Sequence, residues 1–245
     1  MDREIRGYIE NYQFGKMTKA LYNFCNDFLS AFYFDIRKDR LYCDRPDMFE
    51  RRACRTVMAE LYKCLTCWLA PILCFTAEEA WSHRPEGIFE AADSVHLRVF
   101  PDVPADWKNA DLSEKWSHVR KIRKVVLGAI EPHRANKTIG SSLEAHPTIF
   151  LDESYYRAAD GIDLAEVCIV SQVSVESIAA AEKADDVFSL SDVSGVAVAF
   201  HKAEGEKCQR CWKILPEVGS DPEYPDLTKR DADAVRWYIQ NRKAA

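Results

Sequence analysis

The chain has 245 residues, of which 47% are hydrophobic and 29% are charged, so it can bury a sizeable core, and the composition excludes a disordered protein. No apolar run approaches the roughly 18 residues of a membrane span, and residues 1–4 do not resemble a secretory signal, so we expect a cytoplasmic protein with no membrane partner. The net charge of -6 excludes binding of nucleic acid through a uniformly basic surface.

Residues 1–108 have the periodicity of packed helices. Within residues 5–34 the apolar side chains fall on one helical stripe, which includes Met17, Leu21, Phe24, Phe28 and Phe32. A second periodic segment covers residues 54–69, until Pro71 interrupts the backbone hydrogen bonding. We therefore predict an antiparallel helical bundle for residues 1–108.

Two shorter signals follow Pro71. Residues 76–79, Thr-Ala-Glu-Glu, fit a capping box and predict a new helix start. Val95, Leu97 and Val99 alternate with other residues, as in a short strand, within a stretch rich in Pro and Gly. This stretch is predicted to be a loop-rich exit from the bundle.

Residues 109–203 are predicted to form a small α+β domain. A long amphipathic helix comes first, with Trp116, Val119, Ile122, Val126 and Ile130 on its apolar side. The period then changes to two, and strands are predicted at residues 148–151, 167–175 and 196–200. Residues 204–245 form a polar tail that is expected to close with a helix.

Charge is distributed unevenly within this second half. Residues 113–137 contain seven basic and two acidic residues, whereas residues 138–206 contain thirteen acidic and three basic residues. A polyanion is attracted to the first stretch and repelled by the second. Contacts with nucleic acid are therefore expected only at local patches.

Several strings in the first half occur in a characteristic order: YNF at residues 22–24, LSAFYFD at 29–35, KDRLY at 38–42, LAPI at 69–72 and TAEEAW at 76–81. Together they resemble the anticodon-binding helical bundle of class I aminoacyl-tRNA synthetases of the isoleucine, valine, leucine and methionine group. IGSSLEA at 139–145 and GEKCQRCW at 205–212 are similar to the C-terminal extension of bacterial-type isoleucyl-tRNA synthetases. The resemblance covers essentially the whole chain.

The resemblance implies a tRNA-binding C-terminal fragment of an isoleucine–tRNA ligase. The implied partners are isoleucine tRNA and the catalytic domain of the same ligase, with neither DNA nor membrane. The parent enzyme forms an aminoacyl-adenylate with ATP and magnesium in a domain absent from this chain, so no catalytic residue and no cofactor are assigned here. Two alternatives stay open: a free-standing RNA-binding or regulatory paralogue, and a scaffold that no longer binds RNA.

The string KMTK at residues 16–19 resembles the lysine-rich ATP-binding signature of class I synthetases. It lies within a periodic amphipathic helix, and no His-x-Gly-His motif accompanies it anywhere in the chain. We interpret it as helix surface.

Two basic sets are candidate tRNA contacts, because several cations in one region can bind the same phosphate backbone. The first set comprises the cations Arg37, Lys38, Arg40, Arg51, Arg52 and Arg55, together with the aromatic Tyr42. The second comprises Arg120, Lys121, Arg123, Lys124 and Lys137. The alternative for each cation is ordinary solvated surface charge. Tyr33, Tyr42 and Trp68 either stack on unpaired bases or belong to the core.

Nine cysteines in a chain without an export signal predict reduced thiols or metal ligands rather than disulfides. Cys64 and Cys67 have the spacing of half a metal site, but they lie in an apolar helical run where cysteine behaves as a small hydrophobe. Cys208 and Cys211 lie in the polar tail, which is the setting of a zinc ribbon.

The tail of isoleucyl-tRNA synthetases usually holds zinc with two Cys-x-x-Cys pairs, and here the second pair is replaced by Thr228 and Asp231. Two thiolates, a carboxylate and a hydroxyl make a poor tetrahedral set for zinc. We predict that the metal is lost, that Thr228 and Asp231 start the terminal helix, and that the tail is weakly held with Cys208 and Cys211 as free thiols. The expected fold is thus mainly α: a helical bundle, a small α+β domain and a degenerate zinc-ribbon-like tail.

Overall fold

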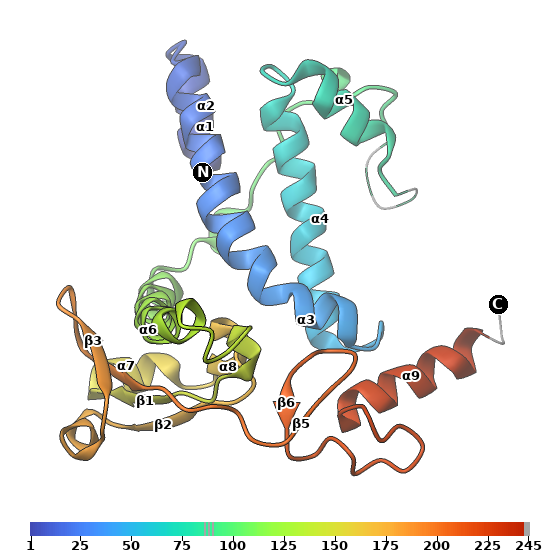
Figure 1. Cartoon of the computed structure of the whole chain (residues 1–245). Helices are drawn as coiled ribbons and strands as arrows, with labels where there is room; N and C mark the ends of the chain where they lie inside the picture. Colours follow the sequence, from blue (N-terminus) through green and yellow to red (C-terminus); the bar gives the residue numbers. More distant parts are fainter. Residues whose placement is uncertain (86, 88, 90, 243–245) are drawn as a thin grey trace. The chain divides into compact units, whose positions relative to one another are not determined.

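The computed structural model describes residues 1–85, 87, 89 and 91–242 (Figure 1). The chain divides into two compact units. The first comprises Met1–Leu41 and Pro46–Lys108, and the second comprises Tyr42–Arg45 and Asn109–Ala245. Among the described helices, none combines the length and the apolar character needed to cross a bilayer.

The first unit is helical, in agreement with the predicted bundle. Its α-helices are α1 (Asp2–Glu10), α2 (Phe14–Asn23), α3 (Asp35–Cys43), α4 (Phe49–Leu69) and α5 (Cys74–Ser82). A π-helical run, Phe24–Phe34, joins α2 to α3, and 3-10 turns occur at Val95–Leu97 and Ala105–Trp107. The core where α1, α2 and α4 meet contains Ile5, Met17, Leu21, Cys64 and Trp68.

The π-helical run explains why the predicted apolar stripe stops short. Met17 and Leu21 are fully buried, as the helical period requires, but Phe28 is 47% exposed and its neighbour Leu29 is buried. In a π-helix the hydrogen bonds run from i to i+5, so side chains drift away from the face predicted for a 3.6-residue turn. The stripe was therefore predicted correctly for Met17 and Leu21 and wrongly for Phe28, while Phe24 and Phe32 are half-buried.

Two local predictions near α5 are wrong. The helix begins at Cys74, and its N-terminus has no side-chain cap, so residues 76–79 do not form a capping box. The neighbouring Glu78 carboxylate accepts hydrogen bonds from the Ser94 hydroxyl (2.8 Å) and the Val95 amide (2.9 Å). Val95 is thereby held in a 3-10 turn rather than in the predicted strand.

The second unit contains a long helix and a small mixed sheet, as predicted. Its elements are α6 (Ala110–Ala135), β1 (Thr148–Leu151), α7 (Glu153–Ala159), α8 (Leu164–Cys168), β2 (Ser174–Ser177), β3 (Val187–Leu190) and β4 (Val193–Ala199). The strand order is β2-β1-β4-β3, with β1 and β2 parallel and the other pairs antiparallel. Short 3-10 segments occur at Ser142–Glu144 and Ile178–Lys183.

The sheet is covered on both faces. One face packs against α6, α7 and α8 through a core that includes Ile122, Ile130, Ile149, Tyr155 and Val198. The other face packs Phe150 and Ala197 against the Ile178–Lys183 segment. Alternation of buried side chains along β1 and β4 is what fills the two layers.

The predicted strand at residues 167–175 is wrong. Its first part belongs to α8, which starts at the N-cap Asp163 and ends at Ile169 in a left-handed conformation with a φ of 56°. The strand β2 begins only at Ser174. A short apolar run does not distinguish a buried helix turn from a buried strand by its periodicity.

The tail comprises the strands β5 (Glu206–Lys207) and β6 (Ile214–Leu215), which form an antiparallel pair, and the helix α9 (Lys229–Arg242). Gly205 has a φ of +113°, and a Cβ placed there would lie 2.3 Å from the carbonyl carbon of Leu215. The hairpin therefore requires glycine at this position. The Ser171 hydroxyl accepts a hydrogen bond of 2.7 Å from the Ile214 amide, which ties the hairpin to the α+β part.

Candidate functional site

The first basic set lies on α3 and on the first turns of α4. Lys38, Tyr42, Arg52 and Arg55 are exposed, and the remaining three members, Arg37, Arg40 and Arg51, are half-buried. Lys38 forms an ion pair of 2.9 Å with Asp35 on its own helix. These cations therefore differ in how available they are to a ligand.

Arg52 and Arg55 are the most available cations of this set. They are three residues apart on α4 and so lie on one face of that helix. Neither side chain makes a hydrogen bond or ion pair with any residue that the structure describes. Phe49, three residues before Arg52, is 79% exposed. Phe49 was not predicted as a contact, although its position directly before a basic run was a usable signal in the sequence.

The aromatic candidates divide in the same way. Tyr42 is 74% exposed, whereas Trp68 is buried in the core of the first unit. Tyr33 is half-buried, and its hydroxyl donates a weak hydrogen bond to the Cys54 sulfur at 3.8 Å. Of the three, only Tyr42 offers an open ring face for base stacking.

The second basic set lies on α6 and just beyond it. Arg120, Lys121, Lys124 and Lys137 are exposed. Arg123 is half-buried, and its Nε donates a 2.8 Å hydrogen bond to the carbonyl oxygen of Val167 near the end of α8. Lys124 forms a 2.6 Å ion pair with Asp192 in the turn between β3 and β4. Arg123 and Lys124 therefore have partners within the unit.

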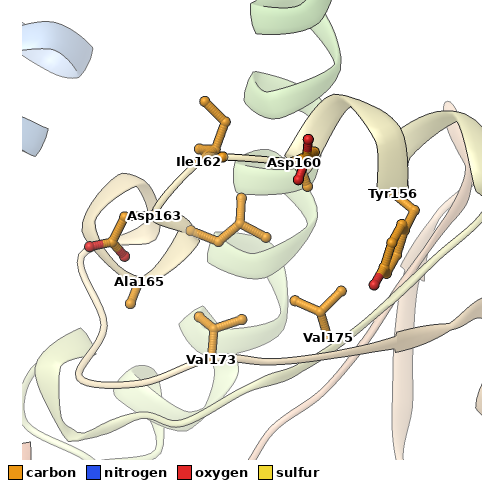
Figure 2. Close-up of a pocket in the computed structure, with 10 residues that line it drawn as sticks. Tyr156, Asp160, Ile162, Asp163, Ala165, Val173 and Val175 are labelled. Atoms are coloured by element: carbon orange, nitrogen blue, oxygen red, sulfur yellow. The ribbon is translucent and has the colours of Figure 1, made fainter.

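A pocket of about 380 Å³ opens in the second unit and was not predicted from the sequence (Figure 2). Apolar side chains from α7, α8 and the start of β2 line it, together with the carboxylates Asp160 and Asp163. Two carboxylates repel phosphate, so this pocket is not suited to a polyanion. Its position agrees with the acidic character of residues 138–206.

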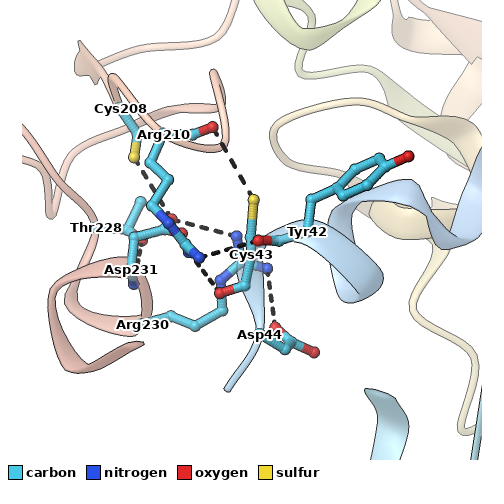
Figure 3. A network of polar contacts seen from close by, with 8 residues as sticks. All are labelled: Tyr42, Cys43, Asp44, Cys208, Arg210, Thr228, Arg230 and Asp231. Carbon is cyan, nitrogen blue, oxygen red and sulfur yellow. Dashed lines mark hydrogen bonds and ion pairs between the residues drawn. The ribbon is translucent and has the colours of Figure 1, made fainter. Parts of the chain in front are cut away.

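Cys208, Cys211 and Asp231 come together in the tail, and Figure 3 shows Cys208 and Asp231 with their polar neighbours. Their sulfur and oxygen atoms all lie within 4.8 Å of one another, and all three residues are buried. The Cys208 thiol donates to Asp231 Oδ2 at 3.5 Å. The hydrogen bond between the two thiols raises the pKa of Cys211, which is also buried and close to the Asp231 carboxylate, and lowers the pKa of Cys208.

Thr228 and Asp231 also start α9, as predicted. The Thr228 hydroxyl accepts a 3.1 Å hydrogen bond from the Asp231 amide and donates one of 2.7 Å to Asp231 Oδ2. The Thr228 carbonyl accepts from the Ala232 amide at 2.8 Å. This is the geometry of a helix N-cap.

Two arginines surround the Asp231 carboxylate. Arg210 Nη1 lies 2.6 Å from Oδ1, and Arg230 Nη2 lies 3.2 Å from Oδ2. Burial raises the pKa of Asp231, but the Thr228 hydrogen bond and the Arg230 charge outweigh it and lower the pKa to about 2. The carboxylate is therefore ionised at neutral pH. Sequence analysis identified Asp231 but neither arginine.

The Cys64/Cys67 pair and the lysines of residues 16–19 lie outside both basic sets and the tail. Cys64 is buried in the core of the first unit, as predicted for a small hydrophobe, and Cys67 is 3% exposed. Lys16 and Lys19 are exposed on α2, in agreement with the interpretation of residues 16–19 as helix surface.

Comparison with known proteins is decisive for the family. Residues 2–149 match the anticodon-binding domain of tRNA ligases. This chain belongs to that anticodon-binding family. Residues 205–234 match a zinc finger found in FPG and IleRS proteins. The first match covers the first unit and the start of the second, and the other lies in the tail.

The chain is also similar to isoleucine–tRNA ligases of known organisms. The chain is 49% identical over 237 residues to an isoleucine–tRNA ligase of Agrobacterium fabrum and 47% identical over 238 residues to one of Brucella abortus. It is 46% identical over 237 residues to that of Bartonella henselae. In each case the alignment covers 96% of this chain and 24% of the relative, so the chain spans about a quarter of the length of these ligases.

The residues in the region of the zinc-finger match differ from the usual ligands of zinc. Structural zinc sites hold the ion with four cysteine or histidine ligands in most cases. Here the described residues that come together are two cysteines and one carboxylate, and the fourth position is the Thr228 hydroxyl, a neutral group already hydrogen-bonded to Asp231. This donor set does not fit a structural zinc site.

Proposed function

We propose that this chain is the tRNA-binding C-terminal part of an isoleucine–tRNA ligase, which recognises isoleucine tRNA and positions it for aminoacylation by a catalytic domain outside the chain. The observation that carries the proposal is the alignment with isoleucine–tRNA ligases over 96% of the chain. The match of residues 2–149 to the anticodon-binding domain supports it independently. The place of action is the cytoplasm, where tRNA is charged.

In this proposal the chain needs no cofactor of its own. ATP and magnesium serve the catalytic domain of the whole ligase, and the tail lacks two of the four thiolates that a zinc finger of this kind uses. The purified chain should therefore show no isoleucine-dependent pyrophosphate exchange above a blank. Exchange activity in the chain would contradict this assignment.

Affinity for tRNA is expected to come from local cations. Arg52 and Arg55 on α4, and Lys121 on α6, are exposed and without partners among the described side chains, so they can contact phosphates without breaking internal interactions. Exposed rings at Phe49 and Tyr42 can stack on unpaired bases. The acidic surface elsewhere limits non-specific binding of RNA.

Binding far from the reacting atoms contributes to catalysis through orientation. Contacts with the anticodon region fix the angle at which the acceptor end of the tRNA reaches the catalytic domain. Such remote contacts raise the rate of the chemical step when they are fully made only in the productive geometry. This is the role proposed for the chain within the whole ligase.

The experiment is a binding titration of the chain with isoleucine tRNA and with a second tRNA, each at two salt concentrations. Tighter binding of isoleucine tRNA, weakening as salt rises, is the expected result. Equal affinity for the two tRNAs would favour a general RNA-binding paralogue. Absence of binding at both salt concentrations would favour a scaffold.

A further inference from the structure

We propose that the tail of this chain is a zinc-finger fold held together without a metal, in which an ion-pair cluster centred on Asp231 takes the place of the ion and fastens the tail to the Tyr42–Arg45 segment. The cluster consists of Asp44, Arg210, Arg230 and Asp231 (Figure 3). This assignment concerns the tail alone and does not depend on tRNA binding.

Hydrogen-bond donors already occupy the Asp231 carboxylate. A carboxylate offers about four acceptor positions. Oδ1 accepts from Arg210, and Oδ2 lies within reach of three donors, the Arg230 guanidinium, the Thr228 hydroxyl and the Cys208 thiol. A metal bound by Asp231 would have to displace at least one of these donors. The positions that a cation would take are filled by hydrogen bonds.

The buried carboxylates of the cluster are compensated by arginines. Asp231 and Asp44 are both 0% exposed, and buried carboxylates need compensating cations. Arg210 and Arg230 supply two positive charges, since Arg230 also lies 3.4 Å from Asp44. The formal charges of these two aspartates and two arginines thus sum to zero. A divalent ion added beside Asp231 would be repelled by two guanidinium groups.

The same arginines also connect the tail to the Tyr42–Arg45 segment. Arg210 donates to the carbonyl oxygens of Cys43 and Tyr42, the latter at 3.0 Å. The Cys43 thiol lies 4.0 Å from the Arg210 carbonyl oxygen, and Arg45 forms a 2.9 Å ion pair with Asp233 of α9. Carbonyls of Tyr42 and Cys43 near the end of α3 are thereby satisfied by a side chain from the tail.

Apolar packing completes the arrangement. Cys43, Cys208, Cys211, Val218, Leu227 and Ala232 form one buried cluster. Cys208 and Cys211 therefore pack against apolar neighbours in this cluster, while the Cys208 thiol donates to Asp231. The sequence alone predicted a weakly held tail. In the structure the tail has a buried apolar cluster that includes Cys43.

The test compares the chain with a variant in which the second cysteine pair is restored. Both are purified without chelator from zinc-supplemented medium, and their zinc content is measured by elemental analysis. The wild-type chain should hold far less than one zinc per molecule, whereas Thr228→Cys/Asp231→Cys should hold one. One zinc per wild-type chain, with Cys208 and Cys211 protected from alkylation until the metal is chelated, would overturn the proposal.

A second measurement tests the cluster itself through the melting temperature. Asp231→Asn keeps the shape of the side chain and removes its charge, so both arginines lose a partner, and the Tm should fall by about 5 to 15 °C. Glu223→Gln is the matched control, because Glu223 pairs with Arg236 at an exposed site next to the same helix and its loss should leave the Tm nearly unchanged. Chelator should not alter the Tm of the wild-type chain. A wild-type Tm that falls with chelator, or an Asp231→Asn variant as stable as Glu223→Gln, would contradict the cluster.

Discussion

The basic start of α4 and the basic face of α6 look alike in the sequence and differ in the structure. Both are dense in arginine and lysine, and both were predicted to contact tRNA. On α4, Arg52 and Arg55 face outward beside an exposed phenylalanine, whereas on α6, Arg123 and Lys124 have partners within their own unit. A count of charges therefore does not distinguish a cation that binds phosphate from one that holds the fold together.

The largest expected effect on tRNA binding comes from α4. Arg52→Glu/Arg55→Glu should weaken binding of isoleucine tRNA by about tenfold or more and reduce the slope of log affinity against log salt by about two, because two phosphate contacts are lost. Affinity measured across a salt series checks both numbers.

The matched control for this variant is Lys16→Glu/Lys19→Glu. It makes the same change in net charge at exposed positions of α2, a helix that carries no member of either basic set. If this control weakens binding as much as the α4 variant does, the effect is one of overall charge and the assignment of α4 fails.

Arg123 should affect stability more than recognition. Arg123→Ala leaves the Val167 carbonyl, near the end of α8, without its guanidinium donor, which should lower the free energy of unfolding by about 1 to 3 kcal/mol. Lys121→Ala, two residues away and exposed, should not change it. Denaturant unfolding of the two variants measures the difference, and equal stability would show that the Arg123 hydrogen bond contributes nothing.

Lys121 should affect recognition and not stability. Lys121→Glu removes one exposed cation from α6, so affinity for isoleucine tRNA should fall by about threefold and the salt slope by about one. The melting temperature should stay the same, since the side chain makes no polar contact with the described residues. Unchanged affinity and slope would remove this face of α6 from the interface.

The smallest effect is expected at the exposed ion pair between Lys124 and Asp192. The hydrogen bond from Lys124 lowers the pKa of Asp192, so Lys124→Gln should raise that pKa toward its ordinary value. Any stability from the pair is present above the ordinary carboxyl pKa and is lost as the pH falls through the lowered value. A carboxyl titration followed by NMR measures the shift, and an Asp192 that titrates identically in both proteins would show that the pair does not persist in solution.

The sequence predicted those elements whose local pattern and tertiary environment agree. Thr148–Leu151 was predicted as a strand over its observed bounds, because β-branched and apolar residues there fill both faces of the sheet. Thr228 and Asp231 were predicted as a helix start, because capping depends only on residues three apart. Leu164–Cys168 was missed, since a buried helix turn and a buried strand have the same apolar composition.

The candidate site was predicted only in part, for a different reason. Asp231 was found through its spacing, but Arg210 acts on it from 21 residues away. Both Arg210 and its counterpart Arg230, the sequence neighbour of Asp231, also reach back to the Tyr42–Arg45 segment, which no local pattern indicates. The π-helical run and the assignment of Tyr42–Arg45 to the second unit likewise depend on long-range packing. The three predicted domains and the individual tRNA contacts stay predictions.

A nuclease or hydroxyl-radical footprint of this chain on isoleucine tRNA tests the proposed role most directly. The anticodon stem and loop should be protected, and the protection should be lost with Arg52→Glu/Arg55→Glu but kept with Lys16→Glu/Lys19→Glu. Protection confined to the acceptor stem, or an anticodon loop as accessible with the protein as without it, would contradict the assignment of this chain as the anticodon-reading part of the ligase.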